Sequence, residues 1–203
     1  MSMKAGRKRS FDKQEVLDTA MRLFWENGFH GTALSDLTAR TGLNKPSLYA
    51  AFGNKEQLFK ASMDHYTQQY GSPLLNKLLE PETAPLEMRL KAYMLATAQL
   101  VTDPQLPKGC MIVNSSCEAA SETIPDEISK KLDEIKKNHN EFFIDFFKKE
   151  QAQGKLNKKY NVKQITSYIN AVISGMGVLA SSGASIKSLN DIIDIAVTNI
   201  FNE

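Results

Sequence analysis

The sequence predicts an all-α protein, with a small three-helix head followed by a larger helical body and about nine helices in total. Apolar residues recur at the three- and four-residue spacing of amphipathic helices along almost the whole chain. Strictly alternating β-branched runs, of the kind that short turns join into hairpins, do not occur. Hydrophobic residues make up 42% of the 203 residues, which is enough to bury a core and excludes disorder by composition.

The first predicted helix covers residues 12–27. Asp12 and Glu15 have the spacing of a capping box, which satisfies free amides at the start of a helix. Gly28 is expected to end the helix, because glycine tolerates the left-handed conformation found there. One face of this helix is apolar and should line the core of the head; it carries Val16, Leu17, Ala20, Met21 and Phe24.

Two short helices follow, at residues 33–40 and 45–52. Thr32 is predicted to cap the first of them and Asn44 the second, and the four-residue turn between them contains Gly42. Two short helices joined by such a turn form a helix-turn-helix. The second helix of this motif fits the major groove of DNA, so the sequence predicts a DNA-binding head.

The outward face of the helix at residues 45–52 is small and polar, with one aromatic ring. The inward face carries Leu48, Ala51 and Phe52, and the outward face carries Lys45, Pro46, Ser47, Tyr49 and Ala50. Lys45 can reach guanine or phosphate, Ser47 can donate or accept at a base edge, and the Tyr49 hydroxyl can bind phosphate. Lys55 begins the next helix, where its charge and the helix N-terminus both favour phosphate. We therefore assign residues 11–54 to the head.

The charge distribution supports this assignment. Residues 1–60 hold ten Lys or Arg and six Asp or Glu, a net of +4, whereas the remainder holds fifteen and seventeen, a net of −2. A basic N-terminal part on a near-neutral body indicates a surface that faces phosphate. Residues 1–10 form a basic arm without apolar periodicity, with Lys4, Arg7, Lys8 and Arg9. We expect this arm to be flexible alone and to follow phosphate or the minor groove of bound DNA; a solubilising tail is an equal alternative.

Residues 55–203 are predicted to form the body, in six further helices. Asn54 and Gln57 cap the first of these helices, and the Gly-Ser-Pro sequence at residues 71–73 is expected to break the chain after it. Proline-containing loops and polar linkers separate the others. The six helices are expected at residues 55–70, 86–101, 109–121, 126–153, 162–180 and 188–201.

The head closely resembles the DNA-binding region of the TetR/AcrR family of bacterial regulators. Spacing, helix caps and residue types agree over roughly a quarter of the chain. The matching residues are Phe24, Trp25, Glu26, Asn27, Gly28, Phe29, Gly31, Thr32, Leu37, Ala39, Thr41, Gly42, Leu43, Ser47, Leu48, Tyr49, Phe52, Asn54, Lys55, Glu56, Gln57, Leu58 and Phe59. In the body, the run from Gly109 to Asn114 also matches.

The resemblance implies that the third helix reads operator DNA, through Lys45, Pro46, Ser47, Tyr49 and Ala50. It also implies contacts from Thr32 and Ser35 at the second helix, and a phosphate contact from Lys55. The family often has His or Tyr where this chain has Ala51, so that contact is left undefined.

The resemblance further implies a homodimer, in which the last two helices pair with their copies in a four-helix bundle. A dimer is also expected because two heads read a palindrome at helical-turn spacing. The eighth helix carries Ile173, Gly175, Gly177, Val178 and Ala180, and the ninth carries Ile192, Ile193, Ile195, Ala196, Ile200 and Phe201. The alternative is that both helices belong to the core of a single chain.

A small-molecule pocket in the body, whose occupation alters the spacing of the heads, is a further implication of the resemblance. The candidate lining residues are Met63, Tyr66, Tyr93, Met94, Met111, Asn114, Phe143 and Phe147. Methionine and aromatic stripes at helical spacing are also typical of plain core, and the effector stays unidentified.

The two cysteines, Cys110 and Cys117, favour neither a disulfide framework nor a metal site. On one helix they would lie roughly 10 Å apart along the axis, which is too far for a disulfide. The three histidines show no ligand spacing relative to them. We interpret both as small buried thiols, with a thiol sensor as the alternative.

The sequence therefore favours a ligand-responsive transcriptional regulator, a repressor that binds a palindromic operator as a dimer and is released by a small effector. A regulator controlled by a protein partner or by thiol oxidation is the alternative. An enzyme is disfavoured, because no nucleophile–base spacing, phosphate loop or metal cluster occurs, and no cofactor is expected. No apolar run is long enough to span a bilayer and no signal peptide is recognisable, so we expect a cytoplasmic protein.

Overall fold

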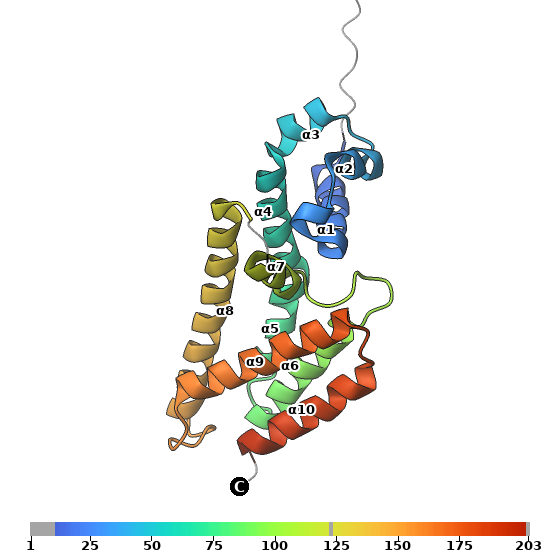
Figure 1. The fold of residues 1–203 in the computed structure, drawn as a ribbon. Helices are drawn as coiled ribbons and strands as arrows, with labels where there is room; N and C mark the ends of the chain where they lie inside the picture. Colours follow the sequence, from blue (N-terminus) through green and yellow to red (C-terminus); the bar gives the residue numbers. More distant parts are fainter. Residues whose placement is uncertain (1–10, 122–123, 202–203) are drawn as a thin grey trace, which may run out of the picture.

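The computed structural model describes residues 11–121 and 124–201, and in this part of the chain it holds helices and no strand (Figure 1). The elements are α1 (Lys13–Gly31), α2 (Leu34–Thr41), α3 (Lys45–Phe52), α4 (Lys55–Tyr66), a π-helical turn η1 (Thr67–Gly71), α5 (Ser72–Leu79), α6 (Leu86–Val101), α7 (Met111–Ser121), α8 (Asp126–Ala152), α9 (Val162–Ser181) and α10 (Ile186–Phe201). The predicted all-α class, with an N-terminal helix-turn-helix and a helical body, is confirmed.

The predicted break at residues 71–73 is wrong. The chain stays helical from α4 through η1 into α5, and Ser72 donates its backbone N–H to Thr67 O across the wider π turn. Pro73, which has no N–H, lies at the start of α5, directly after this π turn. With this run counted once, the described residues form nine helical runs, as the sequence predicts.

The long run from α4 to α5 connects the head to the body. In Figure 1, α1, α2 and α3 form one end of the molecule, α4 descends from them, and α9 and α10 lie towards the opposite end. The first core cluster contains α1 and α4 residues such as Phe24 and Phe59, but also Met111 of α7 and Ile128 of α8. The head and the body therefore share apolar packing along α4. The division between residues 54 and 55 stays a prediction.

The second core cluster lies within the body, where α6 packs with α5, α8, α9 and α10. Ile169 and Met176 of α9 and Ile193 of α10 are almost fully buried in it. Gly177 of α9 is buried, and a Cβ atom there would lie 3.5 Å from Val113 Cβ of α7, so the two helices are in direct contact at this position. Other residues of the same two helices point outward, among them Val178, Leu179 and Ile195.

One buried ion pair joins the start of α6 to the end of α8. Arg89 of α6 donates through Nη2 to the carboxylate of Glu150 of α8, and both side chains are 2% exposed. The same guanidinium donates to Leu78 O at 2.9 Å and to Ala84 O at 3.1 Å. Arg89 therefore also orders the loop between α5 and α6.

Candidate DNA-binding surface and head–body junction

The helix-turn-helix is held by local caps that the sequence predicts. Gly42 ends α2 with a φ of 69°, a left-handed conformation that favours glycine. Asn44 precedes α3, and its side-chain oxygen accepts a hydrogen bond from Ser47 N at 2.9 Å. Leu48 is fully buried in the head core. These contacts orient α3 so that its opposite face points to solvent.

The predicted reading residues lie on this outward face. Lys45, Pro46 and Ala50 are exposed, whereas Ser47 and Tyr49 are half-buried. Lys45 Nζ lies 5.5 Å from the centroid of the Tyr49 ring, a cation–π distance. The exposed atoms are small or flexible, so the face can approach base edges closely. Contact of these residues with DNA stays a prediction.

Thr32 lies elsewhere than the sequence predicts. Its side chain is fully buried, and its hydroxyl donates to Gly28 O at 2.7 Å and to Leu23 O at 3.3 Å. It does not cap α2 either, because Ala33 is the N-cap and Asp36 accepts the Ala33 amide at 3.1 Å. The Thr32 side chain is therefore part of the packing at the end of α1, and the DNA contact predicted for Thr32 stays a prediction. Ser35 is exposed, and its contact with DNA stays a prediction.

Replacement of Thr32 by valine is expected to lower the free energy of unfolding by about 1 kcal/mol, because two backbone carbonyls lose their hydroxyl donor. Valine keeps the shape of the side chain, and Ser35→Ala provides an exposed control. Urea unfolding measures the stability, and operator titrations at several salt concentrations measure the phosphate contacts. A smaller salt slope in Thr32→Val would contradict the buried placement.

Lys55 lies close to an aromatic ring and to a carboxylate. It begins α4, where Asn54 and Gln57 form the predicted capping box. Its Nζ lies 4.5 Å from the centroid of the Phe29 ring. Burial lowers the pKa of the Lys55 ammonium, and the nearby Glu118 carboxylate partly opposes this. The predicted phosphate contact of Lys55 is open to test.

The predicted ligand-binding residues do not lie around one cavity. Met63, Tyr66 and Met111 belong to the core cluster shared by head and body. Tyr93, Met94, Phe143 and Phe147 belong to the second cluster, while Asn114 is half-buried on α7. Seven of the eight are core residues in this structure, so their role in binding an effector stays a prediction.

Two buried tyrosines bring polar groups into this apolar interior. The Tyr66 hydroxyl donates to Cys110 Sγ at 3.4 Å, and the Tyr93 hydroxyl lies 3.4 Å from His139 Nε2. Burial raises the pKa of both tyrosines, and burial lowers the pKa of His139. The two tyrosine hydroxyls and the His139 imidazole are therefore neutral at neutral pH.

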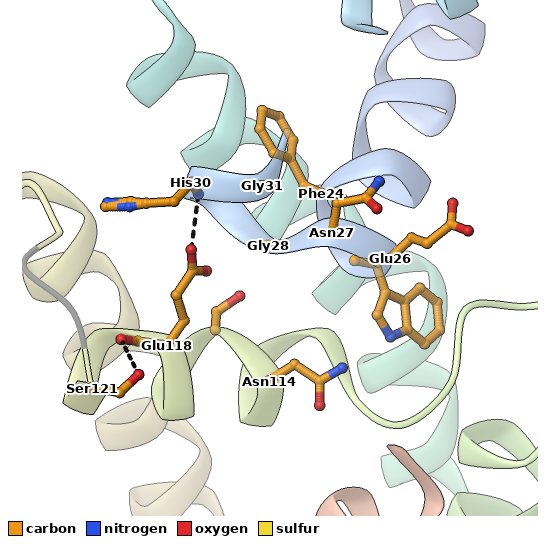
Figure 2. A pocket seen from close by; sticks show the side chains of 11 residues that line it. Phe24, Glu26, Asn27, Gly28, His30, Gly31, Asn114, Glu118 and Ser121 are labelled. Atoms are coloured by element: carbon orange, nitrogen blue, oxygen red, sulfur yellow. Dashed lines mark hydrogen bonds between the residues drawn. The ribbon is translucent and has the colours of Figure 1, made fainter. Parts of the chain in front are cut away.

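An open pocket of about 400 Å³ lies at the junction between head and body. It is formed by the C-terminal end of α1 and one face of α7 (Figure 2). Trp25 lines it, and the buried indole Nε1 of this residue has no hydrogen-bond partner among the described residues. Asn114 and Glu118, one turn apart on α7, line it from the other side. Of the predicted ligand-binding residues, Asn114 alone borders this pocket.

Glu118 is the functional candidate that sequence reasoning missed. Figure 2 shows its carboxylate reaching from α7 to the backbone at His30. It accepts hydrogen bonds from Phe29 N at 2.9 Å and from His30 N at 2.8 Å. The contact joins residues almost ninety positions apart, so no local pattern could indicate it. The sequence indicated only that the helix is interrupted at Gly28, next to the two amides.

Both cysteines are free thiols. Cys110, just before α7, is half-buried, and Cys117, within α7, is exposed, so the interpretation of both as buried is wrong for Cys117. Within residues 11–121 and 124–201, no group of three or more His, Cys, Asp or Glu side chains is arranged to hold a metal ion. No helix in that part of the chain is long and apolar enough to cross a membrane.

Comparison with known protein families places both parts of the chain. Residues 16–62 match the model of bacterial regulatory proteins of the tetR family. Residues 87–190 match the model of the tetracyclin repressor-like C-terminal domain, which covers more than half of the chain. The chain belongs to the TetR family. The predicted resemblance is thereby confirmed, and the TetR family is one of DNA-binding transcriptional regulators.

Relatives of this TetR-family chain include named repressors. The HTH-type transcriptional repressor ComR of Escherichia coli (strain K12) is 34% identical over 189 residues, which cover 92% of this chain and 88% of ComR. The repressor AcnR of Corynebacterium efficiens is 23% identical over 98% of each chain.

Solved structures show the same TetR-family fold. A cysteine mutant of the regulator CifR, in complex with 26-bp operator DNA, has a TM-score of 0.85 at 26% identity and covers 95% of this chain and 98% of CifR. AibR, in complex with isovaleryl coenzyme A and operator DNA, has a TM-score of 0.69 at 22% identity and covers 94% and 98%.

Proposed function

We propose that this TetR-family protein is a homodimeric repressor that binds a palindromic operator through its two heads and is released by a small-molecule effector. The observation that carries the proposal is the outward face of α3. Lys45, Pro46 and Ala50 are exposed on this face and Ser47 and Tyr49 are half-buried, and the buried Leu48 and the Asn44 cap hold the helix in place. ComR is named a repressor, and the CifR mutant was solved on operator DNA. As a regulator of transcription, the protein is expected to act in the cytoplasm.

Selection of bound duplexes from a random DNA pool tests the proposal. The expected product is a motif with two inverted half-sites, because two identical heads related by a two-fold axis read the same sequence twice. Recovery of no motif contradicts specific DNA binding, and recovery of one unrepeated half-site contradicts the dimer. A thermal-shift panel of metabolites and drugs on the same protein then searches for the effector, because a true effector raises the stability.

We propose that α9 and α10 form the dimer interface, because they leave apolar side chains uncovered. Val178 and Leu179 of α9 and Ile195 of α10 are exposed. Exposed apolar side chains that gather on one face of a monomer are typical of an interaction site. Gly177 and Ile193 lie on the same two helices but are buried within the single chain, so we assign them to its internal packing.

Replacement of Ile195 by aspartate is expected to convert the dimer to a monomer, since a carboxylate placed in the proposed apolar interface would be desolvated and unpaired. Met88→Asp is the matched control, because Met88 and Ile195 are both 64% exposed and Met88 lies on α6. Light scattering at micromolar concentration measures the mass. A dimeric Ile195→Asp, or a monomeric wild type, would contradict this interface.

Control by thiol oxidation is a second candidate, because Cys117 is exposed on α7, next to Glu118. Operator titrations with and without peroxide, on the wild type and on Cys117→Ser, separate it from control by an effector. An unchanged operator affinity excludes it.

A further inference from the structure

Near the end of α1, two backbone amides need a hydrogen-bond acceptor from another part of the chain. Gly28 leaves the helical conformation, with a φ of 73° and a ψ of −177°, and one further turn follows as far as Gly31. The first amides of a helical turn have no acceptor within that turn. An N-cap side chain normally accepts them, but Gly28 has no side chain. Phe29 and His30 therefore present donors that another part of the molecule must satisfy.

Glu118 of α7 supplies the missing cap from the body. Its Oε2 accepts from Phe29 N at 2.9 Å and its Oε1 accepts from His30 N at 2.8 Å. Both are short hydrogen bonds to an ionised acceptor, the stronger kind. A carboxylate also suits the positive end of a helical turn. The two bonds together fix the distance and the direction of the head's backbone relative to α7.

Gly28 is required for this approach. A Cβ atom at position 28 would lie 2.7 Å from Glu118 Oε2 and 3.0 Å from its Cδ. The positive φ of this residue also disfavours any other side chain. Both the shape of the turn and the space beside it thus depend on the glycine.

The opposite end of the same α7 face is attached to α9. Asn114, one turn before Glu118, accepts a hydrogen bond from the Ser181 hydroxyl of α9 at 2.8 Å through its Oδ1. Gly177 of α9 lies beside α7, where an added Cβ atom would be 3.5 Å from Val113 Cβ. One helix therefore contacts the head through Glu118 and the proposed dimerisation helix through Asn114. A shift of α9 relative to α1 must therefore either move α7 or break one of its two contacts.

We propose that Glu118 is a positioning residue, which sets the angle of the DNA-binding head relative to the body and thereby the half-site spacing that the dimer accepts. The inference rests on the proposed function and extends it. The head is joined covalently to the body only through α4, and apolar packing among α1, α4, α7 and α8 also holds the two together. Apolar packing is not directional, whereas the two Glu118 hydrogen bonds fix the direction of the α1 backbone relative to α7.

The experiment measures spacing preference with the full-length dimer. The operator selected by the wild type is rebuilt with its half-sites one and two base pairs nearer or farther apart, and each duplex is titrated with wild type, Glu118→Ala and Glu118→Gln. For Glu118→Ala the ratio of affinities between the selected spacing and the altered ones is expected to fall by about tenfold, a usual size for coupling between distant sites. Glu118→Gln can accept one of the two bonds, so it should lie between. Because each ratio is taken within one variant, a uniform change in affinity from the lost charge near Lys55 cancels.

Hydrogen exchange and a matched variant complete the test. The amides of Phe29 and His30 should lose protection in Glu118→Ala, and Glu141→Ala, an exposed glutamate of α8, should behave as wild type in every measurement. A wild-type spacing ratio in Glu118→Ala, or unchanged exchange at the two amides, overturns the proposal. If the alanine variant does not fold, the glutamine variant decides by the same ratio. If the wild type selects no DNA, the proposed function is overturned instead. The positioning role is then tested by small-angle scattering, and it is overturned if Glu118→Gln gives the same scattering profile as the wild type.

Discussion

Replacement of Glu150 by leucine is expected to lower the free energy of unfolding by about 3–5 kcal/mol, the usual effect of removing one partner from a buried ion pair. Leucine roughly fills the volume, so the loss comes mainly from the Arg89 guanidinium, which stays buried with no carboxylate. Leu78 O and Ala84 O still accept from it, but they carry no net charge to balance it. Urea unfolding, followed by circular dichroism, measures the difference.

A double variant separates charge from packing. Arg89→Met with Glu150→Leu removes both charges, and an apolar pair of similar volume often restores most of the stability. Glu82→Gln is the matched control, because Glu82 binds Lys149 at 2.9 Å with both side chains more than half exposed, and such pairs contribute little. The free energy of unfolding of Glu150→Leu could instead lie within about 1 kcal/mol of the wild-type value, as is usual for a surface substitution. That result would show that the buried ion pair contributes little to the stability of the body.

The head was predictable because its signals are local. Asp12 and Asn44 each accept a backbone amide two or three residues away, and Gly42 adopts the left-handed conformation that its position requires. Apolar spacing then places Leu48 in the core. Caps and turns of this kind depend on neighbouring residues only, so the sequence contains all that determines them.

The failures came from choices that local patterns leave open. Thr32 can cap a helix or bond back to the preceding turn, and burial at the end of α1 selects the second. Gly71 and Pro73 are compatible with a break or with a first helical turn, and the packing of α5 selects the turn. Glu118 binds amides almost ninety positions away, which no local pattern records.

The interior of the body could not be interpreted from the sequence for a different reason. Met94 and Phe143 recur at helical spacing whether they fill a core or line a cavity. In this structure they are fully buried among other apolar side chains. Spacing reports which face of a helix points inward, but the presence of a cavity depends on how several faces fit together.

Replacement of Ala50 by glutamate is expected to weaken operator binding by at least roughly 100-fold, because like charges brought together at an interface cost several kcal/mol. Ala50 is exposed on the outward face of α3, so the change should leave the fold intact while it places a carboxylate among phosphates and base edges. Ala92→Glu, at an exposed position of α6, adds the same charge outside the head. Titration of the selected operator measures the loss, and equal affinity of the two variants would show that another surface binds the DNA.

A second substitution on the same face tells phosphate contacts from base contacts. Lys45→Ala should reduce the slope of log affinity against log salt by about 1 if Lys45 binds phosphate, with the same loss on every DNA sequence. If Lys45 reads guanine, the loss should be about 1–3 kcal/mol and should fall on one base position of each half-site. Because Lys45 Nζ lies 5.5 Å from the centroid of the half-buried Tyr49 ring, its starting position is restrained near the helix. We therefore expect the base-specific result, and a loss spread evenly over all sequences would contradict it.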